Sequence, residues 1–240
     1  MRKILVLSDL DGTAVDMYDV HTPVYAEMFH KVYGLTGIDF RGKYNPGGSN
    51  ETTVREVLRY YRDVLHQYDY SDEFIESRMH LVVPILQKLY PQAIRNGTVN
   101  VLPGYEKLMQ SLVKEEIPRG IVTGNILFIT NLILDKSKLQ KYFLFKTTPE
   151  DSTDRKGRLL VAIEKAQRIT GQKYSRNNVY FFDDSITSIP ISRELGIKSV
   201  AVATNSEMPK EIVIERLKAA NPDYFFENLS DTEAVMKIFD

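Results

Sequence analysis

Apolar residues along this chain follow two different periods, and the change between them divides the sequence. A short apolar run at 4–7, followed by Ser8, is typical of a strand that is buried on both faces. From Val99 onward, similar runs alternate with segments whose apolar residues recur at helical spacing. The strands predicted in this part cover 118–125, 143–147, 178–184, 199–203 and 224–226. The helices predicted between them cover 105–114, 126–134, 156–170, 189–195 and 209–219.

The segment 16–99 has no strand pattern and reads as helical throughout. Its predicted helices cover 23–33, 53–68 and 72–89, the last with a kink expected at Pro84. A loop rich in Gly, Asn and Pro precedes the second helix, and Ser49 or Asn50 is its expected cap. Because the first strand has no partner in this segment, it is expected to join the later strands. The sequence therefore predicts an α/β core with a parallel sheet, made of 1–15 and 100–240, with an all-helical domain of 16–99 inserted after the first strand.

Composition narrows the class of protein without identifying it. The chain has 240 residues, a formal net charge of −1 and no long basic run, which argues against nucleic acid as a partner. No apolar stretch approaches the roughly 20 residues of a membrane-spanning helix. The apolar run after Lys3 is too short for a secretory signal, so we expect a cytoplasmic protein that does not bind membranes. It contains no cysteine, which excludes disulfides and thiolate chemistry.

Polar residues stand where several predicted elements begin or end. They are Asp9 and Asp11 after the first strand, Thr123, Gly124 and Asn125 after the next strand of the core, Arg155 or Lys156 at a helix start, and Asp183 and Asp184 after a later strand. Parallel strands carry their ligands at one edge of the sheet, so these groups are expected to meet there. Each has an ordinary alternative, such as a turn for the first acidic pair, a helix cap for Thr123 and a solvated surface position for Lys156. The second acidic pair directly follows four apolar or aromatic residues, a costly position without a counter-charge.

Together these residue types match the needs of phosphoryl transfer. That reaction uses a nucleophile, a proton donor, a divalent cation and donors around the phosphoryl oxygens. Asp9 and Asp11 are one residue apart, and a cation is the simplest relief of their repulsion. The two acidic pairs can supply the nucleophile, the acid and the Mg²⁺ ligands. Thr123 and a Lys or Arg can surround the phosphate.

The order of these motifs resembles the haloacid dehalogenase (HAD) superfamily of phosphatases. Asp-Leu-Asp-Gly-Thr-Ala-Val-Asp at 9–16 carries the most specific part of the resemblance, and Phe-Asp-Asp-Ser at 182–185 the next. The segments 120–125 and 199–204 resemble the phosphoglycolate phosphatase-like branch in particular. The resemblance spans Asp9 to Asp184 and implies a Rossmann-like core, with 16–99 as a helical cap that closes over the site.

The resemblance also implies a role for each motif residue. Asp9 would attack phosphorus and form an aspartyl-phosphate, and Asp11 would protonate the leaving group and later activate water. Mg²⁺ would be held by Asp9, the backbone carbonyl of Asp11 and Asp184, with Asp183 as a nearby ligand or water anchor. Thr123 would hydrogen-bond the phosphoryl oxygens, with Gly124 and Asn125 beside it. A basic residue would neutralise the phosphate.

Two positions depart from the family pattern. The third motif offers Arg155, Lys156 and Arg158, and spacing does not choose among them; we prefer Lys156. In one form of the fourth motif a second Asp follows four residues after the first, whereas this chain has Ser188. The role of Asp183 is therefore open.

The inserted segment carries the candidates for substrate contact. The loop 47–50 is one, with Gly48 and Ser49 as the expected contacts, although a plain helix connector is an equal alternative. Arg41 and Lys43 could approach an anionic substrate or be solvated. All four histidines of the chain lie in this segment at no metal-ligand spacing, and none is assigned chemistry.

The sequence thus predicts a Mg²⁺-dependent phosphatase acting on a small phosphorylated metabolite, with phosphoglycolate as the nearest guess. A phosphosugar mutase of the same superfamily shares every core residue and stays open as an alternative. A signalling receiver domain also forms an aspartyl-phosphate, but it is about half this length and lacks the insertion. A non-catalytic binding protein of the same fold is a further alternative. A monomer or a homodimer is expected.

Overall fold

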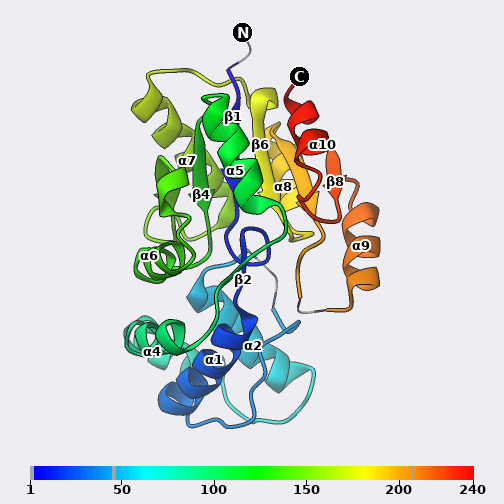
Figure 1. Ribbon diagram of the computed structural model, residues 1–240. Coiled ribbons are helices and arrows are strands. Elements are labelled where there is room, and N and C mark those ends of the chain that lie inside the picture. The colour runs from blue at the N-terminus through cyan, green and yellow to red at the C-terminus, as the bar shows by residue number, and fades with distance from the viewer. Residues whose placement is uncertain (1–2, 45–46, 207) are drawn as a thin grey trace.

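The centre of the molecule is a six-stranded parallel sheet with the strand order β5-β4-β1-β6-β7-β8. The computed structural model describes residues 3–44, 47–206 and 208–240 (Figure 1). The strands are β1 (Leu5–Ser8), β4 (Arg119–Val122), β5 (Phe145–Thr147), β6 (Val179–Asp183), β7 (Lys198–Val202) and β8 (Tyr224–Phe226). β1 lies between β4 and β6, so the chain order reverses beside β1, and ligands of open α/β sheets bind at such a point.

Helices cover both faces of this sheet. They are α5 (Tyr105–Lys114), α6 (Leu127–Lys136), α7 (Arg155–Thr170), α8 (Ser188–Leu195), α9 (Lys210–Ala219) and α10 (Thr232–Met236). Successive strand residues point to opposite faces. Val6 accordingly packs in the cluster that includes α5, whereas Leu5 and Leu7 pack against Leu159 of α7. Burial on both faces explains why β1 is apolar at every position before Ser8.

The structure confirms the predicted α/β class with a parallel sheet. Each predicted strand is present, and most boundaries move by only a few residues. The helix predicted from 156 begins one residue earlier, at Arg155, because Asp154 caps it by accepting a hydrogen bond from the Gly157 N–H at 2.8 Å.

The inserted segment forms a second group of helices at one end of the core (Figure 1). They are α1 (Tyr18–Tyr33), α2 (Asn50–Asp63), α3 (Asp72–Met79) and α4 (Val82–Asn96). The prediction of one kinked helix at 72–89 was wrong, because the chain breaks at His80 and Leu81 and restarts as α4. Pro84 then lies in the first turn of α4, where its missing N–H has no helical partner to lose.

Two other helix boundaries also differ from the prediction. α1 starts at Tyr18 rather than at 23. Val20 and His21 are buried on the same face as the later residues, so the helix extends on the N-terminal side of Pro23. α2 ends at Asp63 rather than at 68, and His66 beyond it has a left-handed φ of 52° that no helix continues through.

A short ribbon joins the two groups of elements. β2 (Val15–Asp16) pairs antiparallel with β3 (Asn100–Val101), at the positions where we expected the insertion to begin and end. Asp16 therefore lies in a strand, although the segment 16–99 was predicted to be wholly helical. One continuous apolar cluster links the ribbon, one face of the sheet and the helices of the inserted segment 16–99, which we call the cap for its place over the strand ends. None of the helices in the described part of the chain is both long and apolar enough to cross a bilayer.

Candidate active site

Three neighbouring strands end at one place, on the side of the sheet that faces the inserted helices. Asp9 follows β1, Thr123 follows β4 and Asp183 ends β6. Because β4, β1 and β6 are adjacent and parallel, their carboxyl ends bring these side chains together. Asp9, Thr123 and the neighbouring Asp184 line a pocket whose opposite wall comes from the inserted segment. The structure therefore brings the predicted strand-end residues together at one pocket.

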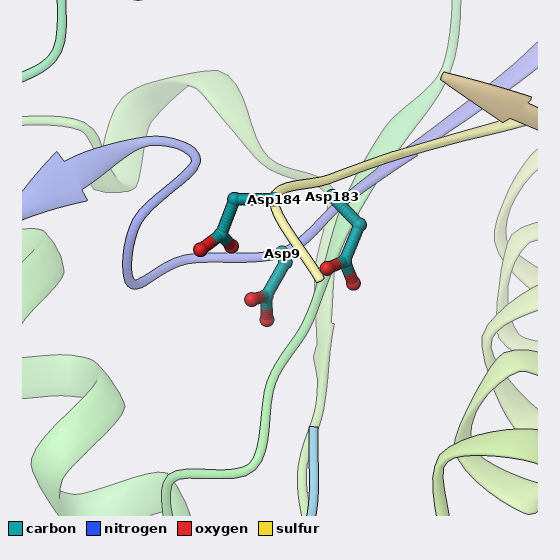
Figure 2. Close-up of side chains that lie close together, drawn as sticks. All are labelled: Asp9, Asp183 and Asp184. Atoms are coloured by element: carbon teal, nitrogen blue, oxygen red, sulfur yellow. The ribbon is translucent and has the colours of Figure 1, made fainter. Parts of the chain in front are cut away.

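Three buried carboxylates form the centre of this site. Asp9, Asp183 and Asp184 each offer an oxygen within 4.8 Å of the others (Figure 2). Burial raises the pKa of Asp9 to about 6, and the neighbouring Arg155 partly offsets this shift. Burial and the charge of Asp9 raise the pKa of Asp184 to about 7. Closely spaced buried carboxylates of this kind suit a hard divalent cation, which takes oxygen ligands and relieves their repulsion.

Gly12 lets the chain turn tightly against Asp184. Its φ is +78°, and a Cβ added there would lie 2.3 Å from Asp184 Oδ2. Thr13 Oγ1 donates to Asp184 Oδ1 at 3.1 Å, and Asn205 Nδ2 donates to Oδ2 at 2.6 Å. The two contacts fix the orientation of this carboxylate beside Asp9.

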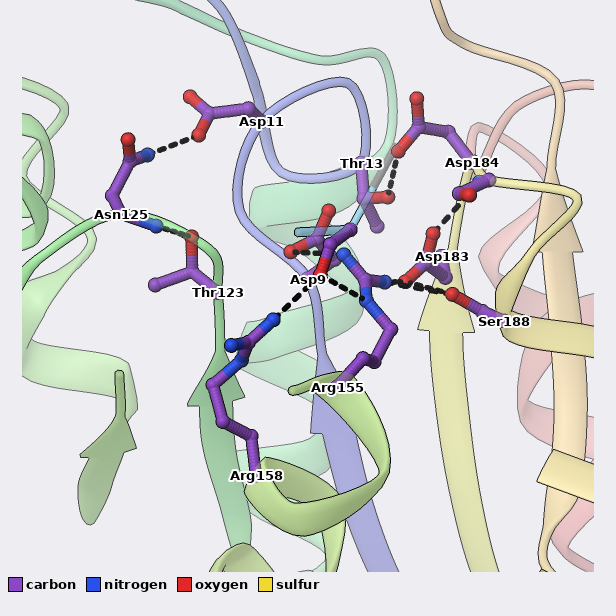
Figure 3. Close-up of polar contacts among 12 residues, drawn as sticks. Asp9, Asp11, Thr13, Thr123, Asn125, Arg155, Arg158, Asp183, Asp184 and Ser188 are labelled. Carbon is purple, nitrogen blue, oxygen red and sulfur yellow. Dashed lines mark hydrogen bonds and ion pairs between the residues drawn. The ribbon is translucent and has the colours of Figure 1, made fainter. Parts of the chain in front are cut away.

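The basic residue of the site is Arg155, not Lys156. The Arg155 side chain is 5% exposed, forms an ion pair with Asp183 and lies 3.8 Å from Asp9 Oδ1 (Figure 3). Lys156 is 44% exposed and pairs with Glu194 on the surface. The preference for Lys156 is thus corrected. Arg155 shares a helix face with Leu159 and Ile163, which dock on the sheet, and the spacing of four residues was the signal that could have identified it.

Asp183 and Ser188 have a shared structural task in holding Arg155. The Ser188 hydroxyl donates to Asp183 Oδ2 at 2.9 Å, and Arg155 Nη1 lies 2.7 Å from the same hydroxyl oxygen (Figure 3). The Ser185 N–H donates to Asp183 Oδ1 at 2.7 Å. The position where an Asp was expected from the family pattern is therefore part of an Asp–Ser–Arg network.

Asp11 has different surroundings from Asp9. Its side chain is 22% exposed and faces the pocket, held by His21 on one oxygen and Asn125 on the other. Asn125 in turn donates its backbone N–H to Thr123 Oγ1 at 3.2 Å (Figure 3). Gly124 and Asn125, the candidates for substrate binding, both line the pocket.

His21 is a site residue that sequence reasoning missed. Its Nε2 lies 3.1 Å from Asp11 Oδ1 in the core, and its Nδ1 lies 2.5 Å from the hydroxyl of Tyr90 in the inserted segment. When Asp11 is ionised it can only accept, so Nε2 of a neutral His21 then donates to Asp11 and Nδ1 accepts from Tyr90. Its position in the first turns of α1, directly after the motif loop, was the available signal. The statement that no histidine has a site role is therefore corrected for this residue.

The loop 47–50 joins the cap to the core. The Gly47 carbonyl accepts hydrogen bonds from Arg155 Nε at 3.2 Å and from Arg158 Nη2 at 2.5 Å. Gly124 packs so closely on the Gly48 carbonyl that a Cβ would lie 1.9 Å from its oxygen. Hydrogen bonds from two arginine side chains and one tight backbone contact thus hold this loop over the strand ends.

The polar side chains of this loop have separate tasks. Ser49 caps α2 by accepting from the Thr52 N–H at 3.2 Å, as expected, and it is not among the pocket-lining residues. Its expected contact with substrate therefore has no support in its position, whereas Gly48 does line the pocket. Asn50 joins cap and core, since its Nδ2 donates to Tyr25 and Asn125, and its Oδ1 accepts from the Ile126 N–H at 3.0 Å.

Comparison with known proteins agrees with this geometry. A family model described as haloacid dehalogenase-like hydrolase matches residues 6–202. No curated protein matches the sequence.

Among solved structures, a predicted phosphoglycolate phosphatase from Haemophilus somnus 129pt is 14% identical with a TM-score of 0.75, and 98% of each chain is covered. A phosphonoacetaldehyde hydrolase like protein from Oleispira antarctica is 16% identical with a TM-score of 0.77, covering 99% of this chain and 92% of that one. A predicted phosphatase from Clostridium acetobutylicum is 16% identical with a TM-score of 0.74, covering 99% of this chain and all of the other. These structures share the fold of the chain.

Proposed function

Because the chain belongs to the haloacid dehalogenase-like hydrolases, we propose that it is a phosphatase that hydrolyses a small phosphomonoester through an aspartyl-phosphate on Asp9. One observation carries the proposal. Asp9 and Asp11 face the same pocket in different surroundings, Asp9 buried beside Arg155, and Asp11 partly exposed between His21 and Asn125. Two carboxylates in contrasting environments suit two roles, one as nucleophile and one as acid and base.

In the first step, an Asp9 carboxylate oxygen attacks phosphorus, and the bond from phosphorus to the leaving oxygen breaks. Asp11 gives its proton to that oxygen, so the product leaves as an alcohol. In the second step, Asp11 takes a proton from water, and the water oxygen attacks phosphorus. The bond to Asp9 then breaks and releases inorganic phosphate.

The residues around the nucleophile suit a phosphoryl group. The Arg155 guanidinium lies beside Asp9 and is held from behind by Asp183 and Ser188, so it is oriented before substrate arrives. Thr123 lines the pocket on the opposite side, at the end of β4. We assign both to binding the phosphoryl oxygens, whose charge grows in the transition state.

Mg²⁺ fits this donor set. Asp9, Asp184 and the backbone carbonyl of Asp11 would hold it, and bound there it would offset the charge of the phosphoryl oxygens and the carboxylates. Asp183 lies in the same cluster, but Arg155 and Ser188 already engage it. We therefore assign it to orienting Arg155, with a water-mediated metal contact as its second task.

His21 serves Asp11 as a positioning residue from the cap. Its contact with Asp11 exists only while α1 lies over the core, because the two residues come from different groups of elements. Closure of the cap thus brings His21 into contact with Asp11 and orients that carboxyl group. Enclosure of the substrate is in this way linked to proton transfer.

The test is release of inorganic phosphate from 4-nitrophenyl phosphate by the intact protein, with Mg²⁺ and with excess chelator. We expect Mg²⁺-dependent hydrolysis and at least about a 10³-fold loss in Asp9→Asn, which keeps the size of the side chain but removes the nucleophile. Wild-type rates in Asp9→Asn contradict the proposal. Conversion of a sugar phosphate to an isomer without release of phosphate would favour the mutase alternative.

A further inference from the structure

The cap side of the pocket is built from aromatic rings and uncharged polar groups. Its lining residues from the inserted segment are Tyr18, His21, Tyr25, Phe40, Tyr44, Gly47, Gly48, Asn50 and Thr53. The rings form a continuous wall, with centroids 4.7 Å apart for Tyr25 and Phe40, which stack, and 5.6 Å apart for Phe40 and Tyr44. A wall of this kind offers apolar contact to carbon atoms and hydrogen bonds to hydroxyls.

The charges of the pocket all belong to the reaction centre. Among the described lining residues, the carboxylates are Asp9, Asp11 and Asp184, and the one side chain with a permanent positive charge is Arg155. Arg155 is already paired with Asp183 and directed at the phosphoryl site beside Asp9. A second negative group on a bound substrate would therefore find no further cation among these residues.

The two cap cations that the sequence offered for an anionic substrate are engaged elsewhere. Arg41 Nε lies 2.9 Å from Asp39 Oδ1, and Lys43 Nζ lies 3.9 Å from Asp39 Oδ2. Lys43 also lies over the Tyr61 ring, 5.8 Å from its centroid. Neither residue lines the pocket. Asn45 and Pro46, which lie outside the described residues, carry no charge.

The space that is left is small. The pocket encloses about 80 Å³ open to water, and one water needs about 10–15 Å³ of such space. A cavity of this size leaves room for a phosphoryl group with a leaving group of a few carbon atoms.

We propose that the substrate is the phosphate ester of a small, uncharged polyol, and not of a carboxylate or a second phosphate. The inference rests on the proposed phosphatase function and concerns the selection of the leaving group at the same site. The alcohol packs its carbon face on the Tyr25–Phe40–Tyr44 wall and directs its hydroxyls to the amide and hydroxyl groups around it. A leaving group with a negative charge is rejected because its charge would leave water for a wall that offers no cation.

The sharpest test uses two substrates that differ in this charge alone. Phosphoglycolate carries a carboxylate where 2-hydroxyethyl phosphate carries a hydroxymethyl group. We expect kcat/KM to be at least about tenfold higher for 2-hydroxyethyl phosphate, because the carboxylate of phosphoglycolate loses its hydration without gaining a cation. 4-Nitrophenyl phosphate is run in parallel as a probe of the chemical step.

A matched pair of variants tests the wall itself. Thr53→Lys places a cation in the cap side of the pocket, and Thr53→Met adds similar length without charge. We expect Thr53→Lys to raise kcat/KM for phosphoglycolate by about tenfold relative to Thr53→Met, and not to raise it for 2-hydroxyethyl phosphate. If the lysine variant fails to fold, the substrate pair on the wild-type protein still decides the question.

The outcomes separate the two proposals. Equal or faster hydrolysis of phosphoglycolate overturns the inference and leaves the phosphatase function standing. Hydrolysis of the aryl ester alone also overturns it, because the small neutral alcohol is then not accepted. No phosphate from any of the three esters overturns the phosphatase function, and the inference falls with it.

Discussion

The two walls of the pocket are built on opposite principles. The core wall places three buried carboxylates at the ends of the adjacent strands β1 and β6 and an arginine at the start of α7, with hydrogen bonds that hold Asp183, Asp184 and Arg155. The cap wall places stacked aromatic rings and neutral polar groups across from them. The difference indicates a division of labour in which the core sets the chemistry and the cap selects the leaving group. His21 links the two walls at the acid, because it is a cap residue in contact with Asp11.

The largest expected effect is a difference in kcat/KM between variants of two adjacent cations of the core, Arg155 and Lys156. Arg155→Ala should lower kcat/KM by about 10²–10³-fold, since it removes the charge beside the phosphoryl site. Lys156→Ala should change it less than about twofold, because Lys156 only forms an exposed pair with Glu194. Rates with 4-nitrophenyl phosphate measure both. Arg155→Lys is the control for misfolding, because it keeps a positive charge that can pair with Asp183. Equal losses at 155 and 156 would refute the assignment.

The next effect concerns the turn that holds Asp184. Gly12→Ala places a Cβ against the Asp184 carboxylate, so the apparent affinity for Mg²⁺ should fall by about 10–100-fold. Gly34→Ala is the matched control, because Gly34 has a similar φ of +72° with nothing within 4 Å of the added Cβ. Both variants should lose thermal stability from backbone strain, but only Gly12→Ala should need more Mg²⁺. An unchanged Mg²⁺ titration in Gly12→Ala would show that the turn does not position the metal ligand.

A smaller effect tests the link from the cap to the acid. His21→Asn should slow hydrolysis of an alkyl phosphate by about tenfold, because Asp11 is then less well placed to protonate a poor leaving group. 4-Nitrophenyl phosphate needs little protonation of its leaving oxygen, so its rate should change much less. His30→Asn, an exposed position on the same helix, is the control. If both esters slow equally in His21→Asn, the residue acts on the fold or on closure rather than through Asp11.

The smallest effect belongs to the aromatic wall. Phe40→Leu removes the ring that contacts both Tyr25 and Tyr44, an aromatic contribution of about 0.5–1.5 kcal/mol, and should raise KM about three- to tenfold. The value of kcat should stay close to wild type, because no core residue changes. Steady-state kinetics with 2-hydroxyethyl phosphate distinguish the two parameters. A fall in kcat as large as that of Arg155→Ala would remove the distinction between the two walls.

The core could be predicted from the sequence because its signals are local. The all-apolar run of β1 reflects burial on both faces, and the acids directly after β1 and β6 fall at one edge in any parallel sheet of this order. The preference for Lys156 failed because adjacent helix residues point about 100° apart and the docked face decides between them. Leu159 and Ile163 lie on the docked face of the helix, and a step of four residues back from Leu159 on that face reaches Arg155.

The cap wall could not be predicted in the same way, because its contacts join distant segments. His21 meets Tyr90 only after α1 packs on α4, and the two residues lie 69 positions apart. Asn50 reaches Asn125 and Ile126 across 75 and 76 positions. No short motif records such contacts. The neutral character of the wall became visible only when the pocket-lining residues were brought together by the fold.

The central claim is that Asp9 carries the phosphoryl group and Asp11 moves the proton. Asp11→Asn tests it most directly, since an aryl ester can still load Asp9 while the water step loses its base. Incubation with 4-nitrophenyl phosphate and Mg²⁺, acid quench and peptide mass analysis should find the mass of one phosphoryl group on the peptide that contains Asp9. A phosphoryl group on another residue, or no covalent adduct despite a burst of 4-nitrophenol, would contradict the account.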